Sequence, residues 1–151
     1  MTTKPTAIIS EMVSRLIADA TLAGWASTNF SRTIKYYVGV DDQDQPESSN
    51  CPFVAFRLGS MSAADDRSHR MIRVDVALVI SDTTADTVSG QTTTMTGLAK
   101  LQDFYYHVER AFDAWFSMSD YNYTATYSES LFEASRPLMR LTFSVTVQGD
   151  Y

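Results

Sequence analysis

The longest strand pattern in the chain, and the feature that most restricts its fold, runs from Ser68 to Asp82. Every second position of this segment is apolar: Ile72, Val74, Val76, Leu78 and Ile80. Strict alternation is typical of a β-strand with one face packed on a hydrophobic core. The other face mixes charged and apolar residues: Met71, Arg73, Asp75, Ala77 and Val79. The segment therefore predicts a long strand with a core face and a second face of mixed character.

Shorter alternating segments predict the remaining strands. They cover Thr33–Val38, Phe53–Leu58, Tyr121–Tyr127, a continuation or turn at Leu131–Ala134, and Leu138–Val147. The polar segment Gly59–Arg67 predicts the turn of an antiparallel hairpin that ends in the long strand. Ser135, Arg136 and Pro137 interrupt the last two segments, which predicts a C-terminal hairpin beside the long strand.

Apolar residues spaced three and four apart predict two amphipathic helices. The first begins near Pro5, which suits a first helical turn, and ends at Gly24, which can adopt the left-handed conformation of a C-terminal cap. The second runs from about Thr94 to Phe116. The expected order is α-β-β-β-α-β-β. This order predicts an α+β fold in which one mixed, mainly antiparallel sheet of about five strands is covered on one face by two helices.

Length and charge narrow the class of protein. The 151 residues fit a single domain, residues 1–151, and the net charge of −6 opposes non-specific binding to nucleic acid or acidic membranes. No segment approaches the roughly 18 apolar residues of a membrane span, and the N-terminus lacks the apolar region of a signal peptide. Cys51 is the single cysteine, so an internal disulfide is excluded. We expect a soluble protein that is intracellular or belongs to a particle assembled inside a cell.

Two polar segments predict exposed arms that reach a neighbouring molecule. The arm at residues 39–51 is acidic, and the arm at residues 83–93 is rich in threonine. Segments this polar bury too little apolar surface to hold themselves in place, and connections of this length are often functional. The candidate contact residues of the arms are Asp41, Asp42, Asp44, Glu47 and Asp86.

Residue patterns of catalysis are missing from the sequence. His107 lies four residues after Asp103 and three before Arg110, which predicts polar contacts along one helix face rather than a general base. His69 follows Asp65 and Asp66, where a solvated turn is favoured over a metal site. No nucleotide-binding glycine loop and no nucleophile elbow occurs. We expect no catalytic residue, metal or cofactor, with a small ferredoxin-like enzyme or an adaptor domain as distant alternatives.

Charged residues concentrate in and around the long strand and its predicted neighbour. They are Asp65, Asp66, Arg67, Arg70, Arg73, Asp75 and Arg140. Because acids surround the arginines, ion pairs within the chain or between subunits are favoured over contacts to phosphate. A face that mixes apolar residues with paired charges is more typical of a protein–protein contact than of open solvent. These residues form the predicted subunit interface.

The layout of these elements resembles the tail terminator, or tail completion, proteins of long-tailed bacteriophages. The resemblance rests on the N-terminal amphipathic helix, the proline-led strand Pro52–Phe56, the charged-apolar strand closing in Asp82, the second helix, and the final segment RPLMRLTFSVTV from Arg136. It covers most of the chain in element order. The acidic arm at residues 39–51 lies outside the match.

The resemblance implies a structural virion protein of the tail or neck, assembled in the host cytoplasm, and no enzyme. Such proteins form a hexameric ring at the head-proximal end of the tail tube, stop tube polymerisation and present the surface that joins the head. The implied partners are further copies, the tail tube protein and a neck or connector protein. DNA passes through the lumen without sequence-specific binding, and an acidic subunit suits this because like charge limits sticking of the phosphates. The nearest alternative is a head-completion or connector protein.

Overall fold

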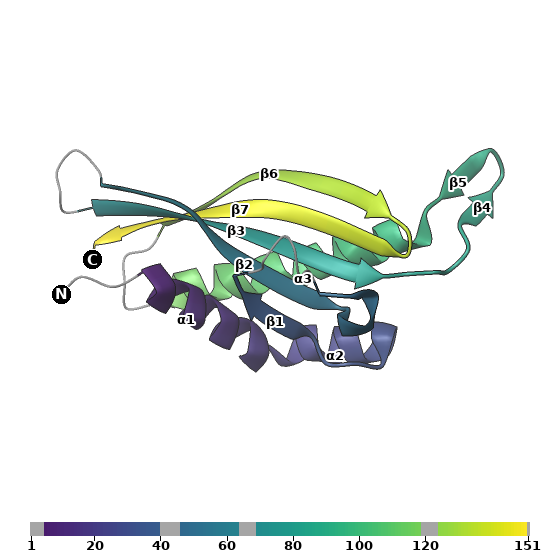
Figure 1. Cartoon of the computed structure of the whole chain (residues 1–151), viewed down its shortest axis with the longest axis horizontal. Helices are drawn as coiled ribbons and strands as arrows, with labels where there is room; N and C mark the ends of the chain where they lie inside the picture. The colour runs from purple at the N-terminus through teal and green to yellow at the C-terminus, as the bar shows by residue number, and fades with distance from the viewer. Residues whose placement is uncertain (1–4, 40–45, 64–68, 119–123, 151) are drawn as a thin grey trace.

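The computed structural model describes residues 5–39, 46–63, 69–118 and 124–150, which form an α+β fold with a mixed five-stranded sheet (Figure 1). The helices are α1 (Pro5–Ala18), α2 (Ala20–Phe30) and α3 (Thr96–Met118), with a short 3-10 turn η1 (Ser48–Asn50). The strands are β1 (Lys35–Val38), β2 (Phe53–Ala63), β3 (His69–Ser81), β4 (Thr87–Ser89), β5 (Thr92–Thr94), β6 (Thr124–Ser135) and β7 (Leu138–Asp150).

The long alternating strand of the sequence lies at the centre of the sheet as β3. The strand order is β1-β2-β3-β7-β6, in which β1 runs parallel to β2 and the remaining neighbours are antiparallel. The C-terminal hairpin joins the sheet through β7, whose register with β3 runs from Ser81 opposite Leu138 to His69 opposite Asp150. Strands β4 and β5 form a separate hairpin.

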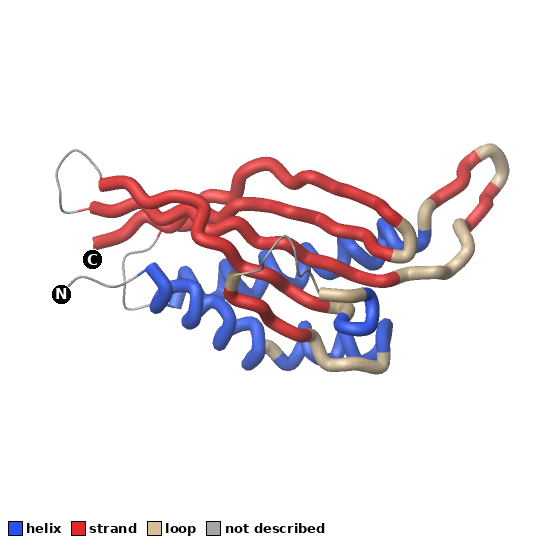
Figure 2. Tube along the Cα trace, viewed as in Figure 1, coloured by secondary structure: helices blue, strands red, loops and turns tan. Residues whose placement is uncertain are grey.

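One face of the sheet and the helices share a hydrophobic core. The even-numbered residues of β3 from Ile72 to Ile80 are buried in the same cluster as Met12 of α1, Leu22 of α2 and Phe104 of α3. The buried residues of β7 in this cluster are Met139, Leu141, Phe143, Val145 and Val147. Figure 2 shows the three blue helices on one side of the red sheet. A period-two apolar face thus packs against helical apolar stripes, which leaves the odd-numbered face of β3 on the other side.

The prediction of one N-terminal helix ending at Gly24 is wrong. The chain breaks at Asp19, where an extended residue separates α1 from α2 and the Asp19 Oδ1 accepts a hydrogen bond from the Leu22 amide at 2.8 Å. This is the usual bond of a helix N-cap. Gly24 lies inside α2, and the left-handed cap residue is Ser31 at φ 54°. Arg110 of α3 donates to both carboxylate oxygens of Asp19, at 3.0 and 3.2 Å, and so fixes the break against α3.

Two predicted loops contain additional strand. Strand β2 continues to Ala63 through the predicted turn at Gly59, because a β-bulge between Leu58 and Ser60 absorbs the glycine. The arm at residues 83–93 contains β4 and most of β5, with Gly90 at the turn in a left-handed conformation, φ 60°. The predicted order of elements is therefore corrected by the addition of α2 and of this hairpin.

None of the helices in the described ranges is long and apolar enough to cross a membrane.

Candidate functional site

A cluster of charged residues lies on the face of the sheet that points away from the helices. Cross-strand register places Asp75 of β3 opposite Arg57 of β2 on one side and opposite Ser144 of β7 on the other. Arg73 precedes Asp75 by two residues and shares its face of β3. Gly59 sits in the bulge of β2 above the same positions. These five residues are named the Asp75 cluster.

The carboxylate of Asp75 is the centre of the cluster. Its side chain is 11% exposed, and its Oδ1 accepts hydrogen bonds from Ser144 Oγ at 2.7 Å and from Arg73 Nε at 3.1 Å. Its Oδ2 accepts from Arg57 Nη2 at 3.3 Å. Burial alone raises the pKa of Asp75, but the bonds from Ser144, Arg73 and Arg57 outweigh it, so the pKa is lowered. The carboxylate is therefore held ionised in a fixed position.

Because Gly59 has no side chain, Asp75 has room to form its ion pairs with Arg57 and Arg73. A Cβ at position 59 would lie 3.1 Å from Arg73 Nε and 3.1 Å from each carboxylate oxygen of Asp75. Such a contact is closer than ordinary van der Waals packing, so any side chain here would press on the cluster. The bulge and its glycine thus serve the charged face rather than a turn.

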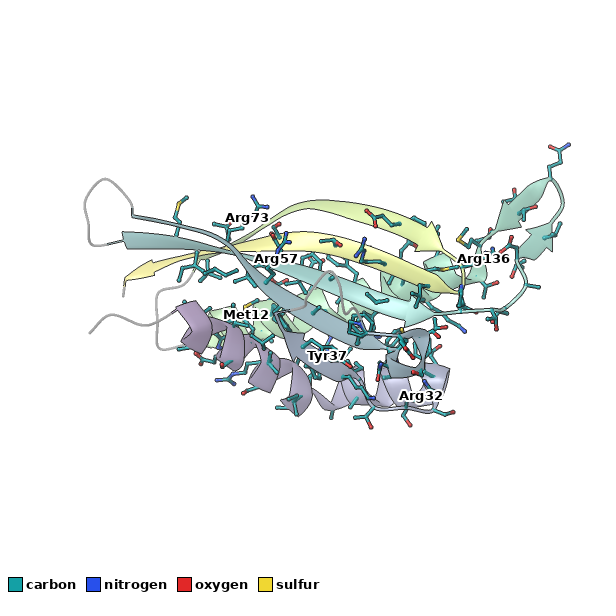
Figure 3. The ribbon with its side chains drawn as sticks, viewed as in Figure 1. Met12, Arg32, Tyr37, Arg57, Arg73 and Arg136 are labelled. Carbon is teal, nitrogen blue, oxygen red and sulfur yellow. The ribbon has the colours of Figure 1, made fainter. Side chains whose placement is uncertain are left out.

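Each of the two arginines in the cluster is hydrogen-bonded to Asp75, but most of its side chain is exposed to solvent. The side chain of Arg57 is 71% exposed and that of Arg73 is 52% exposed. Figure 3 shows both on the sheet, whereas Met12 lies in the helix layer. Two guanidinium groups against one carboxylate leave positive charge on this face, in a chain whose net charge is −6. Fixed guanidinium groups are well suited to bind carboxylates of a partner.

A small apolar cluster covers the other end of the same face. Cys51, Phe53 and Val79 are buried there, with Tyr37, Ala55 and Leu138 packed around them. The backbone around η1 is held over this end by Arg32, whose Nη1 donates to the carbonyl of Ser49 at 2.8 Å and to that of Cys51 at 3.3 Å. Burial raises the pKa of Cys51 to about 11 against the opposing charge of Arg32, which favours the protonated thiol.

The surface depression beside η1 gathers no histidine. Its volume is about 350 Å³, and its walls are Phe30, Arg32, Ser48, Ser49, Cys51 and Ser81. His107 lies elsewhere, with its ring centroid 5.8 Å from that of Trp25 and 5.6 Å from that of Tyr106. Its buried Nδ1 has no hydrogen-bond partner among the described residues, and the guanidinium of Arg110 pairs with Asp19. The described part of the chain holds no group of three or more potential metal ligands.

The structure brings part of the predicted interface together. Arg73 and Asp75 join the cluster as an ion pair within the chain, and Arg140 pairs with Glu133 of β6. Asp65, Asp66 and Arg67 lie outside the described residues, as does the side chain of Arg70. Sequence reasoning missed three members of the cluster: Arg57, Gly59 and Ser144. The alternation of Val54 and Phe56 could have placed Arg57 on the face away from the core, but only the register shows its partner.

The predicted arm at residues 83–93 is attached to the rest of the fold at its base. Asp86 pairs with Arg136 in the turn between β6 and β7, and Thr96 Oγ1 of α3 donates to the Ala85 carbonyl at 2.8 Å. The base of the β4–β5 hairpin is therefore tied to the C-terminal hairpin and to α3. The hairpin projects beyond the sheet (Figure 1), with Val88 69% exposed. Glu47 is exposed at the start of η1. The predicted contacts Asp41, Asp42 and Asp44 lie outside the described residues.

No model of a known protein family matches the chain. A search of curated proteins likewise gives no match. Function is therefore inferred from the geometry of this surface and from the layout of the elements.

Proposed function

We propose that this protein is a structural subunit of a bacteriophage virion, similar to a tail terminator. Copies of the chain form a ring, with hexameric symmetry, at the head-proximal end of the tail tube. The ring stops polymerisation of the tube and presents the surface that joins the head. Its partners are further copies of itself, the tail tube protein and a neck protein, and it catalyses no reaction.

The observation that supports this role most strongly is the Asp75 cluster. The cluster lies on the sheet face opposite the hydrophobic core, where it contributes nothing to core packing. Ion pairs between a nearly buried carboxylate and largely exposed arginines add little net stability. A bulge, a glycine and a buried carboxylate that together fix two exposed arginines are better explained by a contact made through those arginines. Arginine is enriched at the centres of protein–protein interfaces.

The arrangement of the layers also suits a ring. A ring forms when one surface of a subunit meets a different surface of the next copy and the rotation closes. With the helices packed on one face, the opposite face of the sheet is available as one such surface. The projecting β4–β5 hairpin and the segment around Glu47 are suited to reach a neighbouring copy or the tail tube (Figure 1).

Labelling virions with an antibody against this chain tests the proposal by electron microscopy. We expect the label at the junction of head and tail, and we expect free tails to carry it at their head-proximal end. Label on tailless heads, but not on free tails, would instead identify a head-completion or connector protein. Virions without label at either position would contradict a structural role in the neck.

A further inference from the structure

We propose that the depression beside η1 binds a carboxylate that has an apolar group next to it. A polypeptide that ends in an apolar residue presents such a pair of groups, and so does a small free acid. The inference goes beyond the proposed virion role and does not depend on the ring. It rests on four polar side chains from three separate segments that line one depression.

The walls of the depression bring hydrogen-bond donors together from segments far apart in the sequence. Arg32 follows α2 (Figure 3), Ser48 and Ser49 belong to η1, and Ser81 ends β3. Ser48 and Ser49 are exposed and Ser81 is half-buried, so a ligand can reach all three. Each hydroxyl can donate one hydrogen bond to an anionic oxygen. The volume of about 350 Å³ is within the range of small-ligand sites.

The arginine of the depression is held in place by the backbone beside it. Arg32 Nη1 donates to the Ser49 carbonyl at 2.8 Å and to the Cys51 carbonyl at 3.3 Å. Both bonds use one nitrogen, so the exposed guanidinium keeps Nε and Nη2 as a second pair of donors for a carboxylate. Lys35 Nζ adds a bond to Asn50 Oδ1 in η1 at 2.8 Å. These donors are therefore ordered before a ligand arrives, which limits the entropy lost on binding.

Phe30 and Cys51 add apolar surface to the walls. The ring of Phe30 packs edge-on against Trp25, with 5.6 Å between the ring centroids, and Lys100 Nζ lies 5.7 Å from the centroid of Phe30. Phe30 is half-buried, which leaves part of its surface to contact a ligand. An apolar group beside the carboxylate would be removed from water there. The depression therefore favours a ligand that combines both groups over an inorganic anion.

The charges around the depression favour a monoanion over a dianion such as phosphate. Arg32 is the one cation among the described wall residues, whereas Glu47 directly precedes η1 and the chain carries a net charge of −6. Asp82 directly follows β3, but it is buried and its Oδ2 lies 3.4 Å from Lys100 Nζ, so its charge is compensated. One guanidinium matches the single charge and the planar shape of a carboxylate.

Titration of the isotope-labelled full-length chain tests the site by NMR at pH 7 and constant ionic strength. The probes are N-acetyl-leucine, its uncharged amide N-acetyl-leucinamide, and inorganic phosphate. We expect saturable shifts of the amide signals of Ser48, Ser49 and Ser81 with N-acetyl-leucine. The affinity should be weaker by about tenfold or more for the amide and for phosphate. Equal or tighter binding of either, or no saturable shift with N-acetyl-leucine, would overturn the inference.

A short peptide that ends in leucine distinguishes the two sources of the carboxylate. Binding about tenfold tighter than that of N-acetyl-leucine would assign the site to the C-terminus of a polypeptide. Equal or weaker binding of the peptide would assign the site to a small free acid. Either result supports a carboxylate site, provided that the peptide with an amidated C-terminus binds more weakly.

Two variants and a matched control place the ligand in the depression. Arg32→Gln should weaken binding of N-acetyl-leucine by about tenfold or more, because the charged donor is lost. Arg15→Gln changes the net charge equally at an exposed position of α1 and should bind like the wild type. Ser81→Val leaves the bonds of Arg32 in place but narrows the depression, so it should also weaken binding. Circular dichroism checks that each variant is folded.

The Ser81 variant keeps the test decisive if Arg32→Gln displaces η1. Normal binding by Ser81→Val would overturn the placement of the ligand, whatever Arg32→Gln does. Equal weakening in Arg15→Gln would indicate a general effect of net charge and would also overturn it. Failure of the titration leaves the proposed ring standing, because assembly is measured separately.

Discussion

At the scale of single residues, Asp75 makes the mixed face of β3 compatible with a stable sheet. An ionised carboxylate with a side chain only 11% exposed is costly unless its oxygens are hydrogen-bonded. Bonds from Ser144, Arg73 and Arg57 meet that requirement from three strands. The same bonds restrict two long arginine side chains before any partner arrives, which reduces the entropy lost on binding.

Replacing Asp75 with asparagine tests the contribution of its charge. We expect Asp75→Asn to lower the free energy of unfolding at pH 7 by about 1–3 kcal/mol, because charge-assisted hydrogen bonds are lost. The pKa of Asp75 is lowered by folding, so its contribution is present above the unfolded pKa of about 3.9 and is lost as pH falls through the folded value. Urea unfolding should therefore show a smaller difference between the variants near pH 2 than at pH 7. An equal difference at both pH values would contradict this.

Gly59 offers a second test at this scale. Alanine at position 59 should destabilise the protein by about 1–3 kcal/mol, since its Cβ would lie 3.1 Å from three atoms of the cluster. Gly24 is the matched control, because it lies inside α2 and a Cβ there meets no atom within 4 Å. Gly24→Ala should stabilise the helix by about 0.5–1 kcal/mol. Thermal unfolding measures the stability of both variants. An unchanged unfolding temperature for Gly59→Ala would contradict the explanation that a Cβ at position 59 presses on the cluster.

At the scale of elements, the sequence predicted best where a single periodicity governed the segment. Strand β3 was expected over Ser68–Asp82 and spans His69–Ser81, because both its faces are decided by alternation. The break at Asp19 was missed because the apolar period continues through it and alanine flanks it on both sides. Only the contact with Arg110, 91 residues away, shows why the chain bends there. The periodicity of apolar residues within one segment cannot predict a contact with a residue so distant in the sequence.

The bulge and the hairpin illustrate the same limit. Gly59 favours a turn on local propensity, but pairing with β3 carries β2 through it to Ala63. Thr87–Thr94 lacks an apolar alternation, so its hairpin could not be predicted from a buried face. For the candidate site, alternation identified Arg73 and Asp75 on one face. Their partner Ser144 is 69 residues from Asp75 and depends entirely on sheet register.

The break between α1 and α2 supports a prediction about Asp19. Asp19→Ala removes both the N-cap of α2 and the partner of Arg110, and should cost about 1–3 kcal/mol of unfolding free energy. Asp19→Asn keeps an acceptor for the Leu22 amide and should cost less. Urea unfolding of the two variants would contradict the capping role if asparagine were as damaging as alanine.

The β4–β5 hairpin should affect assembly without affecting the fold. Its residues are exposed, and its described contacts to the rest of the fold are at its base, from Asp86 to Arg136 and from Ala85 to Thr96 of α3. Replacing residues 87–94 by a short glycine-serine linker should leave the unfolding midpoint nearly unchanged. Pull-down with tail tubes should then show weaker binding than for the wild type. Normal binding by the shortened chain would remove the hairpin from the proposed contacts.

At the scale of the whole molecule, the helices cover one face of the sheet and leave the other face free to carry charged residues. The hydrophobic core lies between the sheet and the helices, so stability is largely decided on one face of the sheet. The other face can then hold the charged residues of the Asp75 cluster, in a chain whose net charge is −6. In the proposed ring, the arginine-bearing sheet face of one subunit would meet a different surface of the next copy. If the proposed ring surrounds DNA, the acidic chain would limit attraction of the DNA phosphates.

Native mass spectrometry of the full-length protein tests the central claim most directly. The wild type, alone or on tail tubes, should assemble into a closed species whose mass is a fixed multiple of the 16.9 kDa chain, with a hexamer expected. Arg73→Glu should shift the distribution toward folded monomer. The account would be contradicted by a wild-type protein that stays at 16.9 kDa under both conditions. It would also be contradicted by an open series of masses without a closed species.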